Sequence, residues 1–159
     1  MNRDINEEFM RIAIANARYN LDVMSGGPFG ACIVRNGDIL AVARNTVISQ
    51  DATCHAEVNA IRTASRLQMN YDLSGCDIYS TTEPCPMCFG AIHWSKIGRI
   101  IYGTSIEDAK KLGFNELDIS NTTMKELGNS PVEIIGGFLL DECLQLFDEW
   151  RNKKNAAVY

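Results

Sequence analysis

The chain has 159 residues, a length that suits a single domain with a sizeable core. Its formal net charge of −5 argues against a broad basic surface for nucleic acid, although it does not exclude a local basic groove. No apolar run approaches the roughly 20 residues that cross a bilayer, and the N-terminus lacks a signal-peptide core, so we expect a cytoplasmic protein with reduced cysteines.

Hydrophobic periodicity and turn residues divide the chain into helices and strands. Ile5, Phe9 and Ile12 recur at helical spacing, and Asn36-Gly37 between two apolar runs is typical of a hairpin. In chain order we predict a helix over 5–19, strands over 31–34 and 39–43, a helix over 55–67, a strand over 77–81, a helix over 85–94, a strand over 99–102, a helix over 105–112, a polar, loop-rich segment over 115–131, a strand over 132–135 and a C-terminal helix from residue 140. A hairpin followed by alternating strands and helices predicts an α/β fold, a three-layer α/β/α sandwich with a mixed five-stranded sheet in one domain over 1–159.

The strongest chemical signal lies in two short segments, His-Ala-Glu at residues 55–57 and Pro-Cys-Pro-Met-Cys at residues 84–88. Cys85 and Cys88 are spaced i, i+3, so they share a helix face, and a helix N-terminus favours their thiolates. His55, at the start of another predicted helix, supplies a third ligand. Three protein ligands and one open position are typical of a catalytic zinc site, and Glu57 is then left beside the metal as an acid/base group.

This cluster permits two other interpretations. A Cys-x-x-Cys pair in a reducing compartment can be redox-active. A structural zinc site could use Cys54 as a fourth ligand. The side chains of the adjacent Cys54 and His55 diverge, however, and a structural site has no use for Glu57. We therefore favour the catalytic interpretation.

The order His-x-Glu, then Pro-Cys-x-x-Cys, resembles the zinc-dependent cytidine deaminase-like superfamily. The resemblance covers nearly the whole chain, including residues 27–31 and 150–152, and is greater toward bacterial guanine deaminases and the related plant guanosine deaminases. It implies a cytidine deaminase-like fold and one Zn²⁺ per subunit held by His55, Cys85 and Cys88. It also implies that Glu57 takes a proton from water and delivers protons to the ring nitrogen and the departing amine.

The resemblance further implies substrate contacts, at Asn45, Phe29, Ala56, Trp94 and the terminal Tyr159. Glu116 follows Gly113-Phe114 at a position where bacterial guanine deaminases carry an aspartate that is proposed to shuttle protons. Each residue also has a plainer interpretation. Asn45 suits a turn, Phe29 and Trp94 suit a core, and Glu116 suits a solvated loop.

The C-terminal segment, residues 140–159, resembles a segment that guanine deaminases exchange within a homodimer, where it covers the partner's active site. On the residues alone, this amphipathic helix packs on its own subunit. His93 is expected to be a surface or packing residue, and Cys32, Cys76 and Cys143 are expected to be small buried residues.

The expected activity is conversion of guanine and water to xanthine and ammonia in purine catabolism or salvage, with a small purine base as the partner. Membrane and nucleic acid are not expected partners. The alternatives are deamination of guanosine, cytosine or a triazine, a tRNA adenosine deaminase, and a non-catalytic interaction domain stabilised by zinc.

Overall fold

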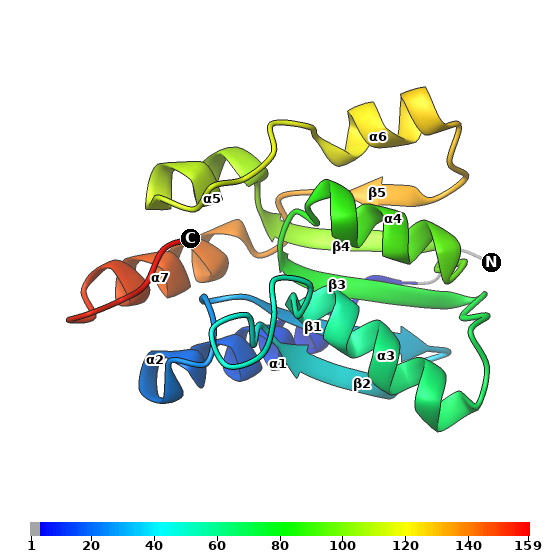
Figure 1. Ribbon diagram of the computed structural model, residues 1–159. Coiled ribbons are helices and arrows are strands. Elements are labelled where there is room, and N and C mark those ends of the chain that lie inside the picture. The colour runs from blue at the N-terminus through cyan, green and yellow to red at the C-terminus, as the bar shows by residue number, and fades with distance from the viewer. Residues whose placement is uncertain (1–3) are drawn as a thin grey trace.

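The computed structural model describes residues 4–159, and its centre is a five-stranded mixed sheet in the order β2-β1-β3-β4-β5 (Figure 1). Strand β1 pairs antiparallel with both β2 and β3, whereas β3, β4 and β5 run parallel. The strands are β1 (Gly30–Arg35), β2 (Asp38–Arg44), β3 (Cys76–Thr82), β4 (Arg99–Thr104) and β5 (Glu133–Ile135). Asn36 and Gly37 join β1 to β2 with φ angles of 53° and 88°, as a two-residue hairpin turn requires.

Helices cover both faces of this sheet, which confirms the three-layer α/β/α prediction (Figure 1). The helices are α1 (Glu7–Arg18), α2 (Asn20–Val23), α3 (Ala56–Gln68), α4 (Pro86–Trp94), α5 (Ile106–Leu112), α6 (Asn121–Gly128) and α7 (Leu140–Arg151). On one face, Ile33 and Ile78 share a core with Ala60 of α3. On the other face, Cys32 and Tyr79 pack in a cluster with residues of α1 and α7. The alternation of successive strand residues between the two clusters follows from the two-residue period of a strand.

Helix α6 departs from the sequence prediction, which assigned residues 115–131 to a loop-rich segment. The helix buries only Asn121 among its own residues, and Leu127 is 85% exposed, so no apolar stripe marks it. Its start is stabilised instead by Ser120, whose side chain accepts a hydrogen bond from the Thr123 backbone N–H. The predicted helix over 5–19 also differs, because it begins at Glu7 after the Asn6 cap and is followed by the separate short helix α2.

The C-terminal segment packs on its own chain. Trp150 is 1% exposed in the main core, and α7 lies beside α1, where Arg11 pairs with Glu142 and Arg18 with Glu149. Beyond α7 the chain turns back across the molecule to Tyr159 (Figure 1). Within one chain, therefore, this segment packs as the residues alone indicate, and its exchange between subunits stays a prediction.

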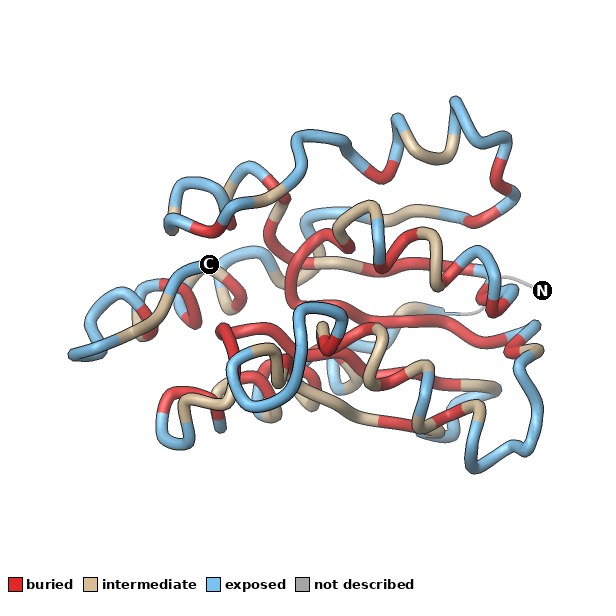
Figure 2. The backbone as a smooth tube through the Cα atoms, in the orientation of Figure 1, coloured by how far each residue is buried: buried red, intermediate tan, exposed pale blue. Residues whose placement is uncertain are grey.

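Burial follows the sheet, with buried backbone concentrated along β1, β3 and β4 and on the inner sides of the helices (Figure 2). All residues of β3 are buried, as expected for a central strand covered on both faces. Among residues 4–159, none of the helices has the length and apolar character needed to cross a membrane.

Candidate metal centre and substrate pocket

Two helix N-termini bring the predicted metal ligands together. His55 is the N-cap of α3, Cys85 is the N-cap of α4, and Cys88 lies in the first turn of α4. Their ligand atoms all lie within 4.8 Å of one another. The two helices follow β2 and β3 and start at the same end of the sheet (Figure 1).

The spacing of these atoms fits zinc. His55 Nδ1 lies 3.6 Å from Cys85 Sγ and 3.5 Å from Cys88 Sγ. A tetrahedral zinc ion with the usual Zn–N and Zn–S bond lengths would hold nitrogen and sulfur about 3.6 Å apart. A hydrogen bond from the Cys88 thiol, together with His55, lowers the pKa of Cys85 to about 4, so one ligand is poised as a thiolate. Cys54 does not join the group, because its sulfur contacts Gln50 Oε1 at 3.2 Å and Arg62 Nη1 at 3.5 Å.

Glu57 lies beside the ligands and is 6% exposed. One of its carboxylate oxygens is 3.5 Å from Cys88 Sγ, and the other is 2.9 Å from the Ser80 hydroxyl. Burial raises the pKa of Glu57, because a carboxylate loses hydration in this environment. The group can therefore accept a proton and hold it, which is the property required of an acid/base residue.

A cavity of about 210 Å³ opens next to the cluster. It is lined by both kinds of predicted residue: the metal ligands His55 and Cys85, the acid/base residues Glu57 and Glu116, and the substrate residues Phe29, Asn45 and Tyr159. Glu116 is half-buried, and burial followed by the charge of Cys85 raises its pKa to about 7. This position favours the proton-shuttle interpretation over that of a solvated loop glutamate, and the role of Glu116 stays a prediction.

Tyr159 closes this cavity from the C-terminus. Its hydroxyl donates to Asn45 Oδ1 at 2.7 Å and accepts from the Gly27 backbone N–H at 2.9 Å, and its carbonyl oxygen accepts from Asn115 at 2.8 Å. Burial raises the pKa of Tyr159 to about 12, so the hydroxyl stays a donor. Gly26 permits the close approach of Asn45, since an added Cβ would lie 2.2 Å from Asn45 Oδ1.

Two predicted substrate residues lie outside the cavity in this chain. Trp94 ends α4, about 13 Å along the helix axis from Cys85, and is 81% exposed. It lines a different hollow with His93, whose Nδ1 lies 2.9 Å from Ser130 Oγ. Ala56 is fully buried and is not among the residues that line the cavity. In this single chain Trp94 does not line the cavity, and its contact with a base stays a prediction.

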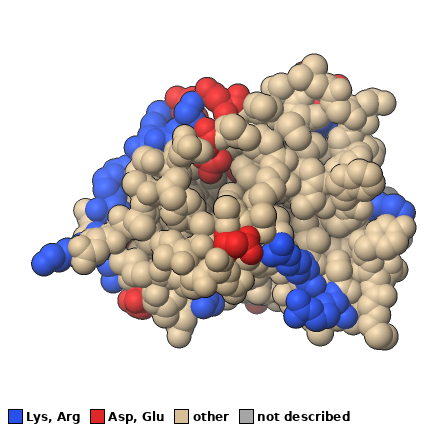
Figure 3. Space-filling view, viewed as in Figure 1, with Lys and Arg blue, Asp and Glu red and all other residues tan. Residues whose placement is uncertain are grey.

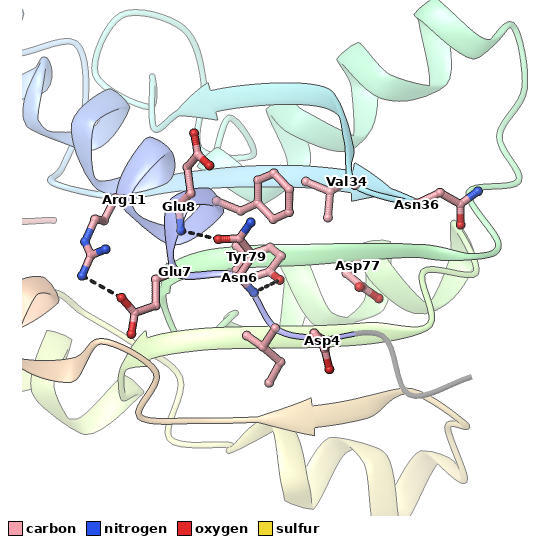
Figure 4. A pocket seen from close by; sticks show the side chains of 12 residues that line it. Asp4, Asn6, Glu7, Glu8, Arg11, Val34, Asn36, Asp77 and Tyr79 are labelled. Atoms are coloured by element: carbon pink, nitrogen blue, oxygen red, sulfur yellow. Dashed lines mark hydrogen bonds and ion pairs between the residues drawn. The ribbon is translucent and has the colours of Figure 1, made fainter.

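A larger cavity of about 770 Å³ lies between the start of α1 and the neighbouring strands β1 and β3 (Figure 4). Acidic side chains such as Glu7 and Glu8 surround it, with Asn6 and Tyr79 joined by a hydrogen bond at its centre. The residues that line it include neither the metal ligands nor the predicted substrate contacts. The smaller cavity is therefore the candidate site.

Sequence reasoning missed several polar residues behind the site. Ser80 contacts Glu57, and Glu83 and Asn121 bind backbone groups around the segment that carries Cys85. A glutamate placed directly before Pro84-Cys85, at the end of a strand that is buried throughout, was the available signal for Glu83. The other two sit in sequence contexts that give no sign of their partners. The buried positions of Cys32, Cys76 and Cys143, by contrast, are confirmed.

The fold and this metal centre define a class of enzyme. A model of the cytidine and deoxycytidylate deaminase zinc-binding region matches residues 3–104. The chain belongs to this family of zinc-binding deaminases, and the geometry of His55, Cys85 and Cys88 agrees with zinc as its metal.

Individual relatives resemble the chain over almost its full length. The guanine deaminase of Bacillus subtilis is 39% identical over 158 residues, which cover 97% of this chain and 99% of that protein. A tRNA-specific adenosine deaminase of Buchnera aphidicola is 36% identical over 155 residues, which cover 96% and 97% of the two chains. Among solved structures, guanine deaminase from Nitrosomonas europaea superposes with a TM-score of 0.84 at 27% identity over 94% of this chain and 86% of its own. The Bacillus subtilis guanine deaminase structure gives 0.67 at 36% identity over 98% and 99%.

Proposed function

We propose that this chain, as a single deaminase domain, catalyses the hydrolytic deamination of guanine to xanthine and ammonia, in purine catabolism or salvage. The observation that carries the proposal is the hydrogen bond from the C-terminal Tyr159 to Asn45 at the wall of the cavity beside the metal ligands, in a chain that resembles a guanine deaminase over 97% of its length. A cavity of about 210 Å³ suits a small planar base better than a polymer.

The chemistry follows from the residues around the cavity. Zinc, when bound, supplies a Lewis acid that makes water more acidic. Glu57 would take one proton from the attacking water and give it to the ring nitrogen while the water oxygen adds to the ring carbon that bears the amine. It would then take the remaining proton of the new hydroxyl group and give it to the amine, which leaves as ammonia as the C–N bond breaks. Asn45 and Tyr159 present an amide and a hydroxyl to the edge of the base, while Phe29 and Phe114, with ring centroids 4.9 Å apart, form the apolar wall.

Glu116 lines the same cavity and supplies a second group that can exchange protons. Its raised pKa lets it exchange protons near neutral pH, which suits a group that passes a proton to a leaving amine. Replacement of the family's aspartate by glutamate lengthens the side chain by one methylene, and the structure still keeps this residue at the cavity wall.

The rival function is deamination of adenosine in tRNA, supported by the 36% identity to a tRNA-specific adenosine deaminase. An RNA loop needs an open site and phosphate-binding side chains. Here the C-terminal Tyr159 occupies part of the cavity wall. On the face seen in Figure 3 the Lys and Arg side chains form separate groups, with acidic atoms in the central hollow. These features favour a free base.

Ammonia release from guanine, guanosine, adenine, cytosine and a tRNA anticodon hairpin, measured on zinc-loaded protein, tests the proposal. We expect the highest kcat/KM on guanine. A Glu57→Gln variant should keep one zinc per chain and lose turnover, which controls for contaminating activity. Faster deamination of the hairpin or of guanosine would overturn the proposed substrate.

We also infer that the protein is a cytoplasmic homodimer, and that the two subunits can exchange the segment 140–159. Two observations support an assembly. Trp94 and Leu127 expose 81% and 85% of their surface on the neighbouring helices α4 and α6, a face suited to a second copy. The Bacillus subtilis guanine deaminase structure superposes less well than the Nitrosomonas europaea one despite its higher identity, as expected when one element is placed differently. Light scattering of wild type and of Trp94→Ala gives the oligomeric state directly.

A further inference from the structure

Glu83 occupies the junction between the sheet and the metal-binding segment. It follows the last residue of β3, precedes Pro84-Cys85, and is 7% exposed. Its backbone N–H donates to the Thr104 carbonyl oxygen at 2.7 Å, which anchors the residue at the end of β4. A carboxylate buried to this degree requires hydrogen-bond donors.

The two oxygens of this carboxylate bind two different helices. Oε2 accepts from the Ile106 N–H at 3.1 Å, and Oε1 accepts from the Asn121 N–H at 2.8 Å. Ile106 and Asn121 are the first residues of α5 and α6, where backbone N–H groups lack partners within the helix and a negative charge is favoured. One side chain thus joins the starts of both helices.

Asn121 completes the connection from the other side. Its side-chain Nδ2 donates to the Pro84 carbonyl oxygen at 2.5 Å, so α6 is bound both to Glu83 and to the residue that precedes the ligand Cys85. The segment between α5 and α6, residues 113–120, carries Glu116 at the cavity. The helices on both sides of that segment are therefore fastened to the metal-binding strand end by one carboxylate.

Neither helix needs Glu83 as its cap. The Ser105 side chain accepts from the Asp108 N–H to start α5, and the Ser120 side chain accepts from the Thr123 N–H to start α6. What Glu83 adds is the link between these helix starts and the segment that holds Cys85. A helix cap alone would not require a carboxylate from a distant strand.

We propose that Glu83 is a positioning residue that sets the distance of Glu116 from the metal centre by tying the starts of α5 and α6 to the strand end before Cys85. The proposal rests on the proposed function, because it assigns Glu83 an effect through Glu116. Misplacement of a reacting group by about 1 Å can lower turnover by about 100-fold, so a link of this kind affects kcat.

The first test compares Glu83→Gln with the cap variants Ser105→Ala and Ser120→Ala. Gln keeps the volume of Glu83 but turns an NH₂ group toward one helix N–H. We expect Glu83→Gln to retain one zinc per chain, with kcat for guanine reduced at least about 10-fold and KM changed less than about 3-fold. The cap variants should lose thermal stability while kcat stays within about 2-fold of wild type. Equal kcat losses in all three variants, or loss of zinc from Glu83→Gln, would overturn the proposal.

Glu83→Asp separates the link from the charge. Asp keeps the negative charge but is one methylene shorter, so it cannot reach both helices. Under the proposal its kcat falls as in Glu83→Gln. A wild-type kcat in Glu83→Asp would contradict the proposal, because the negative charge at this position would then be enough without the link between the two helices. In the double variant Glu83→Gln/Glu116→Gln, kcat should equal that of Glu116→Gln alone, whereas independent, additive losses would contradict an effect through Glu116.

Hydrogen exchange monitored by mass spectrometry supplies a readout that needs no substrate. Amides of residues 113–120 should exchange faster in Glu83→Gln than in either cap variant, since only the former releases both helix starts from the strand end. Unchanged exchange there would overturn the positioning role. If wild type fails to deaminate guanine, the proposed function fails while the exchange comparison still decides whether Glu83 positions residues 113–120. If Glu116→Gln is fully active, guanine deamination stands but the effect of Glu83 through Glu116 is overturned.

Discussion

At the scale of single residues, Ser80 can serve both protonation states of Glu57. Its hydroxyl lies 2.9 Å from Glu57 Oε1 and 2.7 Å from the Thr82 carbonyl oxygen. When Glu57 is ionised, the hydroxyl can donate to the carboxylate. When Glu57 is protonated, the hydroxyl can accept from it and donate to Thr82 instead. Ser80 and Glu57 therefore stay hydrogen-bonded in both protonation states of Glu57.

Ser80→Ala should consequently lower kcat for guanine about 10-fold with zinc content unchanged, because Glu57 loses the hydrogen bond that orients it. Steady-state kinetics and metal analysis measure this. Thr82→Val, which removes the nearby hydroxyl that pairs with Thr104 at 2.8 Å, is a matched control on the same strand. A kcat for Ser80→Ala within 2-fold of wild type, with the control unchanged, would contradict an orienting role.

The second residue-scale prediction concerns pH. Burial and the charge of Cys85 raise the pKa of Glu116 to about 7, and a bound zinc cation lowers it somewhat. The amino group of a base is a hydrogen-bond donor, and ionised Glu116 accepts from it more strongly than the protonated acid does. We therefore expect kcat/KM to decrease as pH falls through about 7 or slightly below, and this limb to disappear in Glu116→Gln. Persistence of the same limb in that variant would assign it to another group.

At the scale of elements, the C-terminal tail is fastened to the cavity by the hydroxyl of Tyr159, which bridges Asn45 and Gly27. Tyr159→Phe keeps the edge contact with Phe114, whose ring centroid is 5.2 Å away, but removes both hydrogen bonds. A net loss of about 1 kcal/mol corresponds to a 5-fold change, so KM for guanine should rise about 5-fold or more with zinc retained. Val158→Ala tests the neighbouring tail position, and an unchanged KM in Tyr159→Phe would argue against a binding role for the tail.

Elements that carry a pattern in their own residues were predictable, and elements held by distant partners were not. Turn residues predict the hairpin, and hydrophobic periodicity predicts the helices that begin at His55 and Cys85. Helix α6 has no apolar stripe and depends on Ser120 and on the carboxylate of Glu83, which is 38 positions from Asn121 in the sequence. The position of Trp94 relative to the cavity was not predictable for the same reason, because it depends on the direction of α4 rather than on the residues next to Trp94 in sequence.

At the scale of the whole molecule, the metal centre joins α3 and α4, which belong to different halves of the sheet. Its chemistry was evident from ligand type and spacing, whereas the cavity depends on the meeting of the hairpin, the segment after α5 and the C-terminus. Residues from such separate parts of the chain converge only when the sheet is formed. The metal ligands could therefore be predicted from residue type and spacing. The place of Tyr159 at the cavity could be predicted only from the family resemblance.

Zinc removal should therefore destabilise the fold as a whole. A ligand present at 100 times its Kd contributes about 2.7 kcal/mol to the free energy of unfolding. For a chain of this size each kcal/mol corresponds to about 2–4 °C, so chelation should lower the melting temperature by about 5–10 °C, and added zinc should restore it. Calorimetry of wild type and of Cys88→Ser, which should show no response to chelator, measures the effect. An equal response in both proteins would place the stabilising metal elsewhere.

The packing of α7 against α1 also bears on how two copies would meet in the proposed homodimer. Arg11 and Arg18 lie two helical turns apart, as do their partners Glu142 and Glu149, so both ion pairs form in the same alignment of the two helices. A second copy offers the same arginines and the same core groove, so α7 would gain equal contacts in either chain. Whether α7 packs on its own chain or on a second copy then depends on two things. One is the conformation of the short link over residues 136–139, where Gly137 and Leu139 have positive φ, and the other is the effective concentration of α7 near its own chain. Substitutions in that link, rather than in the helix contact itself, should shift the balance between closed monomer and interlocked pair.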